Sequence, residues 1–237
     1  MKQLAISVLV LAFISGCKKN NSGPHLPYPL IRKTIETLAD GTTATRVFEY
    51  DGQGRLRKIT TNGAVTVSLS YGQQFVVSEI TENGEPAILL RHLDGQGLVD
   101  TSYVILRSSG DTISKTLRLY NGARQCVRLV DITGYRIAAD SMVYEDGNNV
   151  RTIMGSGLGQ YVRTFRKDIE NTTGFRNTGM SFLGADNKNA VALVRTEGSF
   201  IFPDQNHEYE LDEQGRISRM RLFSGQELVS TTVYEYY

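Results

Sequence analysis

The sequence predicts an all-β protein, an antiparallel up-and-down meander of repeated hairpins that forms a large curved sheet, a roll or an open barrel. Apolar and polar residues alternate in segments 43–50, 64–71 and 115–120, and this two-residue period is typical of strands with one solvated face. Asp-Gly and Asn-Gly pairs recur between such segments, as hairpin turns require. No segment has the pattern of a long helix. We therefore expect hairpins from residue 31 to the end.

The first element, residues 1–16, has the pattern of an export signal. Lys2 precedes an apolar run over residues 4–14, and the run closes on Ile14-Ser-Gly-Cys17. This arrangement resembles a bacterial lipoprotein signal peptide with its lipobox. The run of about 11 apolar residues is shorter than the roughly 20 that a spanning helix needs. We expect residues 1–16 to be removed and Cys17 to be acylated, so that the membrane is a partner of the protein.

Residues 17–30 are expected to be the lipidated cysteine and a flexible tether. Three prolines lie within residues 23–29, and proline disfavours both helix and ladder pairing. His25 lies in this segment. Lys18 directly follows the cysteine that we expect to be acylated. The lack of an aspartate at this position resembles lipoproteins that are sorted to the outer membrane of Gram-negative bacteria rather than retained in the inner membrane. The expected location is the cell envelope, anchored to the outer membrane and facing either the periplasm or the outside.

The net charge and the cysteine content limit the classes of partner that the protein can have. Lys2 is the only charged residue before Cys17, so the mature chain holds 25 basic and 25 acidic residues. A neutral chain lacks the basic surface that phosphate binding needs, which excludes nucleic acid as a partner. Acylation of Cys17 leaves Cys126 without an intramolecular partner, and we expect Cys126 to be a small buried hydrophobic residue.

Residues 31–237 are expected to form a single β-rich domain, because about 207 residues suit one large core. An aromatic or leucine residue precedes a turn five times, at intervals of 21, 22, 27 and 24 residues, which indicates one hairpin per interval. The turns at Asn62-Gly63 and Asn83-Gly84 fall between these five and are expected at the opposite edge of the sheet. The five residues before the turns are Tyr50, Tyr71, Leu93, Tyr120 and Tyr144.

Two turns share a longer motif, Phe48-Glu-Tyr-Asp-Gly-Gln-Gly-Arg-Leu56 and Tyr209-Glu-Leu-Asp-Glu-Gln-Gly-Arg-Ile217, and residues 93–99 are a reduced copy. The motif resembles the tyrosine-aspartate hairpin repeat of Rhs-type cell-surface proteins. Together with the lipobox, the chain is more similar to a group of Bacteroidota lipoproteins of unknown function, of the DUF4595 kind. This resemblance implies an envelope location and a β-rich fold, but no reaction and no catalytic residue.

A polar, turn-rich excursion interrupts the alternation at residues 166–189. The lipoprotein group has a comparable excursion before a final hairpin that ends in tyrosines, and this chain ends Tyr234-Glu-Tyr-Tyr237. It differs from the group because no proline lies near Asn171. An open sheet needs protected edges, so we expect the excursion to cover an edge strand.

Candidate metal and cofactor motifs are explained by turn chemistry. Asp51, Asp94 and Asp212 each begin a glycine-containing turn but lack the alternating ligands and the glutamate of a calcium loop. The glycine-rich segment 155–159 leads into a strand pattern rather than a helix, unlike a dinucleotide-binding loop. Arg55 and Arg216 are expected to brace their own hairpins or to lie along the solvated sheet face, rather than to bind an anionic ligand. We predict no metal site, no cofactor and no catalytic residue.

Tyrosines are the candidate ligand-binding residues. A sheet face that exposes tyrosine can bind glycans or proteins by stacking and hydroxyl hydrogen bonds. The alternative is a ladder in which each ring packs on its cross-strand neighbour, and the placement of the rings before turns favours this ladder. Tyr234 and Tyr236 share the pattern, and the residues predicted for binding are Tyr50, Tyr71, Tyr120 and Tyr144.

Two functions fit these patterns. The first is a non-enzymatic envelope lipoprotein whose β domain is structural or binds a glycan or protein partner on its sheet face. The second is a carbohydrate-active enzyme of the envelope that uses a carboxylate pair, which would require two acids about 5 to 9.5 Å apart across a cleft. Glu79, Glu82 and Glu85 cluster in the sequence, although a polar turn explains them better. The oligomeric state is left open.

Overall fold

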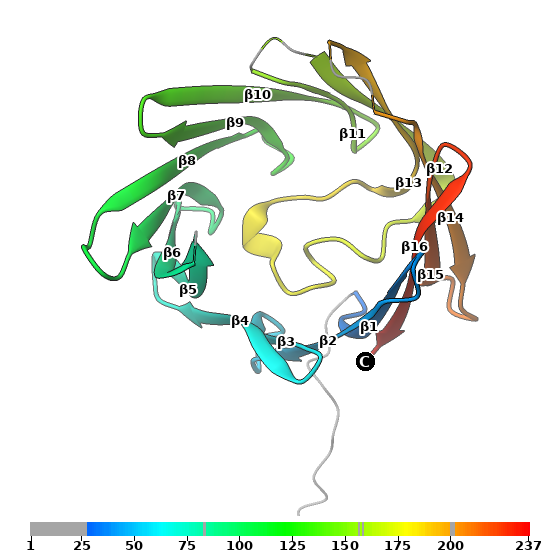
Figure 1. Ribbon diagram of the computed structural model, residues 1–237, viewed down its shortest axis with the longest axis horizontal. Coiled ribbons are helices and arrows are strands. Elements are labelled where there is room, and N and C mark those ends of the chain that lie inside the picture. Colours follow the sequence, from blue (N-terminus) through cyan, green and yellow to red (C-terminus); the bar gives the residue numbers. More distant parts are fainter. Residues whose placement is uncertain (1–27, 83, 156, 158, 200–201) are drawn as a thin grey trace, which may run out of the picture.

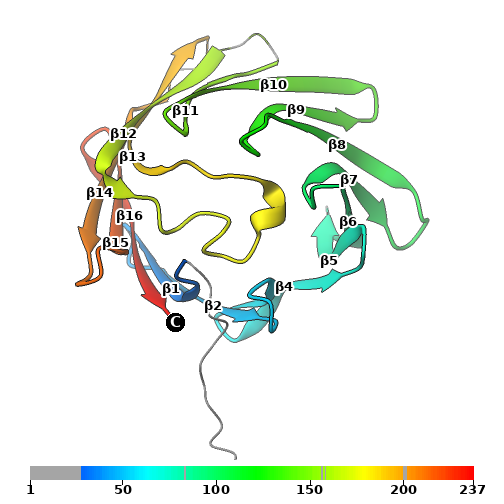
Figure 2. The same ribbon diagram turned by 180° about the vertical axis from the view of Figure 1, so that it is seen from behind.

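The computed structural model describes residues 28–82, 84–155, 157, 159–199 and 202–237, and in it the chain forms a closed antiparallel barrel of 16 strands. Each strand pairs with the next in sequence, and β16 pairs with β1 to close the ring (Figures 1 and 2). Cys17 and His25 lie outside the described residues. The strands are β1 (Ile31–Leu38), β2 (Thr43–Tyr50), β3 (Leu56–Thr61), β4 (Ala64–Tyr71), β5 (Phe75–Glu82), β6 (Glu85–Leu93), β7 (Val99–Leu106), β8 (Thr112–Tyr120), β9 (Cys126–Thr133), β10 (Arg136–Glu145), β11 (Asn148–Ile153), β12 (Gly159–Glu170), β13 (Asn189–Gly198), β14 (Gln205–Leu211), β15 (Ile217–Ser224) and β16 (Glu227–Tyr236).

The predicted all-β antiparallel meander is confirmed. The barrel is closed, however, whereas we expected an open one. Ile31 at the start of β1 pairs with Tyr236 at the end of β16, so no strand of the barrel is left as an open edge. Closure removes the unpaired backbone groups that an open sheet would expose. The excursion after β12 therefore has no edge to protect, and its expected role as an edge cover is wrong.

Turn positions divide the barrel into two ends. The turns that follow even-numbered strands lie at one end, here called the tyrosine end, together with the start of β1 and the end of β16. All five turns predicted after an aromatic or leucine residue lie there. The turn at Asn62-Gly63 and the one between β5 and β6 lie at the opposite end, which confirms the predicted alternation.

Four turns of the tyrosine end share one pattern of side-chain hydrogen bonds. In the β2–β3 turn, Asp51 Oδ1 accepts hydrogen bonds from the backbone N–H groups of Gln53 and Arg55, at 2.9 and 3.0 Å. The turn residues Asp94, Asn121 and Asp212 make the same pair of bonds two and four residues on. The prediction that these aspartates serve as turn residues is confirmed.

The arginines after two of these turns brace their hairpins, as predicted. Arg55 donates from Nε to Asp51 Oδ2 at 2.7 Å, and its guanidinium lies 4.2 Å from the centre of the Tyr71 ring. Arg216 repeats the arrangement with Asp212 at 2.6 Å and with the Tyr236 ring at 4.7 Å. Both side chains combine an ion pair with a cation–π contact.

The excursion folds into the barrel lumen as a plug, defined here as residues 171–188. The plug contains one short 3-10 helix, η1 (Ser181–Leu183), and both views show it as a yellow loop inside the ring of strands (Figures 1 and 2). It leaves β12 and returns to β13 at the tyrosine end. The plug therefore narrows that end of the lumen.

Hydrogen bonds fix the plug to widely separated strands. Asn177, which is 0% exposed, donates from Nδ2 to the carbonyl of Pro29 and accepts from Ile31 N–H at its own carbonyl, both at 2.8 Å. Leu56 N–H donates to Gly179 O at 3.0 Å, and Ile217 N–H donates to Thr172 Oγ1 at 2.9 Å. The plug thus satisfies backbone donors at the starts of odd-numbered strands.

The hydrophobic core lies between the plug and the inner wall of the tyrosine end. Its larger cluster surrounds Phe182 of η1, and a smaller one is formed by residues of β12, β13 and β15. Burial of these side chains is the main force that holds the plug inside the barrel. The buried members are Ile31, Phe48, Leu56, Leu69, Val76, Val99 and Phe182 in the first cluster and Ile169, Ala190 and Ile217 in the second.

The outer wall has two different halves. Side chains alternate across a strand, so residues adjacent to the inward tyrosines and core residues point outward. Over β14–β16 and β1–β3 the outward positions carry ion pairs such as Lys33–Glu235, Glu49–Lys58 and Glu210–Arg219. Over β5–β10 the outward rows are mostly apolar and include Val77, Leu90, Tyr103, Leu117, Val130, Ile132 and Ile137.

Within the described part of the chain, no helix has both the length and the apolar character to cross a membrane.

Candidate functional site

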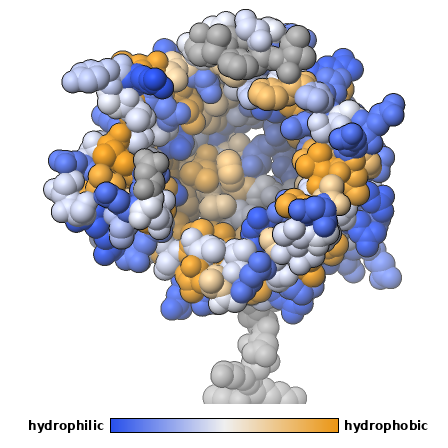
Figure 3. Space-filling model, in the orientation of Figure 1, coloured by the Kyte–Doolittle hydropathy of each residue, from blue (hydrophilic) through white to orange (hydrophobic). Residues whose placement is uncertain are grey.

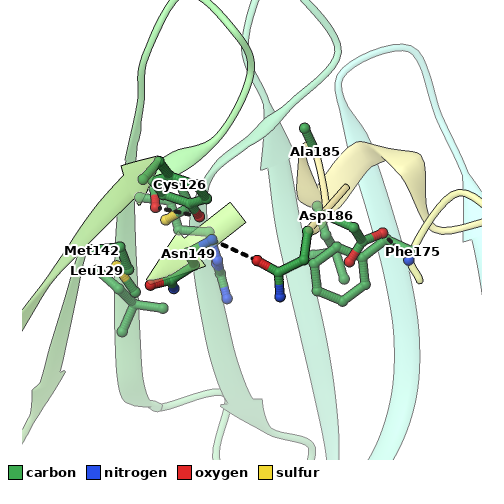
Figure 4. Close-up of a pocket in the computed structure, with 11 residues that line it drawn as sticks. Cys126, Leu129, Met142, Asn149, Phe175, Ala185 and Asp186 are labelled. Carbon is green, nitrogen blue, oxygen red and sulfur yellow. Dashed lines mark hydrogen bonds between the residues drawn. The ribbon is translucent and has the colours of Figure 1, made fainter. Parts of the chain in front are cut away.

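The candidate site is a pocket of about 340 Å³ in the lumen, between the plug and strands β8–β11. Figure 3 shows the molecule hollowed in the middle of the ring, with apolar side chains visible inside the hollow. The close-up in Figure 4 shows the wall residues on one side and the plug residues Phe175, Ala185 and Asp186 on the other. The pocket is lined by Arg118, Cys126, Leu129, Met142, Tyr144, Asn149, Phe175, Leu183, Ala185, Asp186 and Asn187.

The wall side of the pocket is positioned by strand register. Arg118 and Leu129 are cross-strand partners of β8 and β9, so both point to the same face of the sheet. Arg118 donates from one guanidinium nitrogen to Ser102 Oγ at 2.8 Å. Asn149 N–H donates to Asn187 Oδ1 at 2.7 Å (Figure 4), which joins the wall to the plug. The lining of the pocket therefore combines apolar side chains with a few polar groups.

Asp186 is the ionisable group that the plug presents to this pocket. Burial raises the pKa of its carboxyl to about 6, although the backbone N–H groups of Phe175 and Arg176 oppose this shift. Of the described residues that line the pocket, Asp186 alone carries a carboxylate. A carboxyl group with a pKa near 6 can exchange a proton close to neutral pH.

The raised pKa predicts a pH-dependent stability. Between about pH 4 and pH 6 the folded protein retains a proton on Asp186 that the unfolded chain has released, so stability falls as pH rises through this window. The change is on the order of 2–3 kcal/mol. We expect Asp186→Asn to remove this loss and to be more stable than the parent at pH 7, because the amide oxygen still accepts from Phe175 N–H. Urea denaturation at pH 4, 5, 6 and 7 measures the difference.

Two comparisons isolate the effect of Asp186. Burial lowers the pKa of His207, which weakens the fold as pH falls and acts in the opposite direction; the difference between parent and variant cancels this contribution. The matched control is Asp168→Asn, at an exposed carboxyl paired with Arg166, which should gain no stability at pH 7. A parent-to-variant difference that is the same at pH 4 and pH 7 would contradict the prediction.

The four tyrosines predicted for binding lie in a ring at the tyrosine end, each with its hydroxyl bonded to the backbone. Tyr50 donates to Ile31 O, Tyr71 to Leu56 O, Tyr120 to Val99 O and Tyr144 to Cys126 O, at 2.6, 2.7, 3.0 and 3.1 Å. Burial raises the pKa of Tyr71 and of Tyr144 to about 12 and that of the other two still further. Of the four, Tyr144 borders the pocket, and a binding role for them stays a prediction.

Tyr209 and Tyr236 extend the ring in the same way. Each of the six tyrosines lies on an even-numbered strand and donates to a carbonyl near the start of the preceding strand. Tyr234 lacks this geometry and packs against both core clusters. The regular contact to the neighbouring strand favours the structural ladder over a stacking platform.

The ring should contribute measurably to stability. Tyr236→Phe removes a hydroxyl that donates to Ile217 O at 2.8 Å and lies 3.0 Å from Thr172 Oγ1. We expect a loss of about 1–2 kcal/mol, because a buried carbonyl loses its partner. The control is Tyr103→Phe on the outer wall, which should change the free energy of unfolding by less than about 0.5 kcal/mol. Equal losses in urea denaturation would show that the ring hydroxyls contribute nothing specific.

The remaining sequence candidates are dispersed. Cys126 is half-buried on the pocket wall rather than in the core, and burial raises the pKa of its thiol. Glu79 and Glu85 bond to Arg107 and Ser108, which follow β7, and Glu82 is the cross-strand partner of Glu85 in the β5–β6 hairpin. Among the described residues, no group of three or more His, Cys, Asp or Glu could hold a metal ion.

Sequence reasoning missed the arginines of the lumen. Arg118 stands two positions before Tyr120, and Arg91 two positions before Leu93, so each shares the inward face of the residue that precedes the turn. This spacing was available in the sequence. The fact that the inward face encloses a lumen was not.

Comparisons with known proteins identify the fold. No protein-family model and no curated protein matches the chain. A porin-like protein from Bacteroides uniformis, 13% identical, superposes with a TM-score of 0.65 over 89% of this chain and 100% of its own. A porin-like protein from Bacteroides vulgatus, 11% identical, superposes with a TM-score of 0.60 over 88% and 99%. The barrel is thus a known architecture, while the resemblance to the DUF4595 and Rhs-type groups stays a prediction.

Proposed function

We propose that this protein is a lipid-anchored barrel of the bacterial cell envelope that binds a ligand in its lumen. One observation carries the proposal: the plug is fixed by hydrogen bonds inside the barrel yet leaves a pocket of about 340 Å³ between itself and the wall. Ligand sites in proteins are concave, mostly apolar and supplied with a few placed polar groups. This pocket has that composition.

Several observations support the envelope location. The leader resembles a lipoprotein signal, and the two structural neighbours are described as porin-like proteins of Bacteroides. The ion pairs on the outer wall of β14–β16 and β1–β3 favour water over lipid there, since an arginine or lysine facing lipid near the bilayer midplane costs about 2–4 kcal/mol. A lipid on Cys17 would then hold the barrel at the membrane surface.

The test is recovery of a ligand from native envelopes. The full-length protein is purified in mild detergent and examined by native mass spectrometry, and we expect an added mass that is released on denaturation. Ala185→Trp, which fills the pocket, should abolish the added mass. Thr231→Trp, on the outer wall opposite Arg221, should retain it. Absence of any added mass from the parent, or equal retention by both variants, would contradict lumen binding.

Anchoring is tested separately. We expect radiolabelled palmitate to be incorporated into the parent and not into Cys17→Ser, and the parent to fractionate with outer membranes. Labelling that is independent of Cys17 would remove the lipid anchor from the proposal.

A second candidate function, carbohydrate hydrolysis, is favoured by a different pocket. Glu170 and Asp186 border one cavity of about 440 Å³ at the tyrosine end. Glu170 is ion-paired with Arg176, whereas burial raises the pKa of Asp186 to about 6. Two carboxyl groups in such different environments fit the roles of base and acid. Hydrolysis of 4-nitrophenyl glycosides that is lost in both Glu170→Gln and Asp186→Asn would support this function, and activity retained in both variants would exclude this pair.

A further inference from the structure

Three arginines line the lumen around the pocket. Arg118 borders the pocket directly. Arg91, on β6, shares the inward face with its partners Val76 and Ser102, of which Val76 belongs to the core cluster. Arg163, on β12, donates to Thr152 and Asn149, and Asn149 also lines the pocket. These three side chains, here called the arginine arc, therefore extend from β6 across β8 to β12.

Each arginine of the arc is held by a neutral hydroxyl on the preceding odd-numbered strand. Arg91 donates to Ser78 at 3.1 Å, Arg118 to Ser102 at 2.8 Å and Arg163 to Thr152 at 2.9 Å. All three hydroxyl residues are buried. A guanidinium has five N–H donors in a rigid fork, so one hydroxyl orients the group and leaves donors for another partner.

The arc differs from the arginines of the outer wall, which pair with carboxylates. Among the residues that the structure describes, no ion pair involves Arg91, Arg118 or Arg163, whereas Arg219 and Arg221 pair with Glu210. Burial lowers the pKa of Arg91 to about 10, with Arg118 as a second cause, and burial also lowers that of Arg163. Partly desolvated cations without counter-charges attract anions more strongly than solvated ones.

Among the described residues, the acids that face this part of the lumen accept hydrogen bonds from neutral groups and form no ion pair with the arc. Asp131 accepts from the Thr116 hydroxyl at 2.7 Å, Asp140 accepts from Gly155 N–H at 2.9 Å, and Asp186 accepts from Phe175 N–H. Because none of these three carboxylates pairs with an arginine of the arc, the remaining guanidinium donors stay available to an anion.

We propose that the lumen ligand is an organic anion whose carboxylate, sulfate or phosphate group binds Arg118, with Arg91 and Arg163 adding to the positive field. Its apolar or ring-shaped body would lie against Leu129, Met142 and Phe175. This inference rests on the proposed lumen binding and adds the chemical class of the ligand. Arginine suits this role because its planar fork binds oxyanions in a bidentate manner.

The test uses four probes of similar size on the full-length protein in a neutral detergent. The probes are 4-nitrobenzoate, 4-nitrophenyl sulfate, 4-nitrophenyl phosphate and the neutral 4-nitrobenzamide. Isothermal titration calorimetry should show binding of at least one anion at least tenfold tighter than binding of the amide, and the order of the three anions identifies the preferred head group. Raising the salt concentration from 50 to 500 mM should lower the affinity for the anion several-fold.

Variants assign the effect to the arc. Arg118→Gln should lower the affinity for the preferred anion at least tenfold, and Arg118→Lys should restore part of this loss. Arg91→Gln and Arg163→Gln should each lower the affinity several-fold. The control Arg221→Gln, on the outer wall, should leave the affinity unchanged. Circular dichroism and thermal melting confirm that each variant is folded.

The proposal is overturned if none of the three anions binds more tightly than 4-nitrobenzamide, if no anion binds, or if Arg118→Gln leaves the affinity of the preferred anion within twofold. These results are distinguishable from failure of the proposed function. A ligand that co-purifies with the parent and is displaced by Ala185→Trp, yet is uncharged, would keep lumen binding and exclude the anion. Absence of any co-purified ligand and of any probe binding would reject both.

Discussion

Gly179→Ala is expected to destabilise the protein by about 2–5 kcal/mol, because the plug meets the barrel wall at this glycine. Gly179 has a φ of +71°, and a Cβ there would lie 2.5 Å from Leu56 N and 2.8 Å from Gly54 O. Both contacts are with backbone atoms, which cannot turn aside as a flexible side chain can. The variant must therefore displace the plug and weaken the bond from Leu56 N–H to Gly179 O. Urea denaturation of the parent and the variant measures the loss.

Gly41→Ala is the matched control for this substitution. Gly41 has a similar φ of +84°, but nothing lies within 4 Å of a Cβ built there. Its cost should be the backbone strain alone, about 1–2 kcal/mol. The difference between the two variants measures the close approach of plug and wall. Equal losses of stability in the two variants would show that the plug and the wall are not closely packed at Gly179.

Leu56→Ala is expected to cost about 2–5 kcal/mol, the range for buried leucines that leave a cavity. Leu56 is 0% exposed and packs in the cluster around Phe182 of the plug. The space left behind lies between two parts that are hydrogen-bonded to each other, so collapse into it is restricted. The free energy of unfolding from urea titration at neutral pH gives the measurement.

Leu119→Ala is the control of the same chemistry on the outer wall. Leu119 is 56% exposed, and we expect its truncation to cost less than about 1 kcal/mol. A loss at Leu119 that matches the loss at Leu56 would mean that the apolar outer half of β5–β10 is covered by something in solution, and that the core around the plug is not the main source of stability.

The hairpins were predictable because their determinants are local. A turn is specified by a few consecutive residues when an aspartate or asparagine accepts a hydrogen bond from the backbone N–H two residues on, as Asp51 and Asn121 do. Alternation sets the faces of the strands in the same local way. The position of each turn at one end or the other then follows from strand order alone.

Closure and the plug were not predictable because they depend on distant pairs. Nothing near Ile31 in the sequence shows that it pairs with Tyr236, and nothing near Asn177 shows that it bonds Pro29 and Ile31. The polar excursion was recognisable in the sequence. Its polar residues, however, form hydrogen bonds with backbone groups at the starts of strands inside a lumen. In an open sheet they would have lain on a surface. The arginine arc was hidden for the same reason, since an inward-facing arginine on a strand is recognisable only once an inside exists.

The closed ring has a consequence for how the chain must fold. β1 is the first strand to be synthesised, yet it bonds to β16, so the strand nearest the expected lipid anchor completes its pairing only after the last strand is made. Contacts between residues about 200 positions apart carry a large loop-closure entropy and slow folding. Until they form, the chain presents two unpaired strand edges that can recruit other chains. A chain that ends before β16 would retain those edges permanently, so truncated forms of this protein should accumulate as aggregates or be degraded rather than persist as smaller barrels.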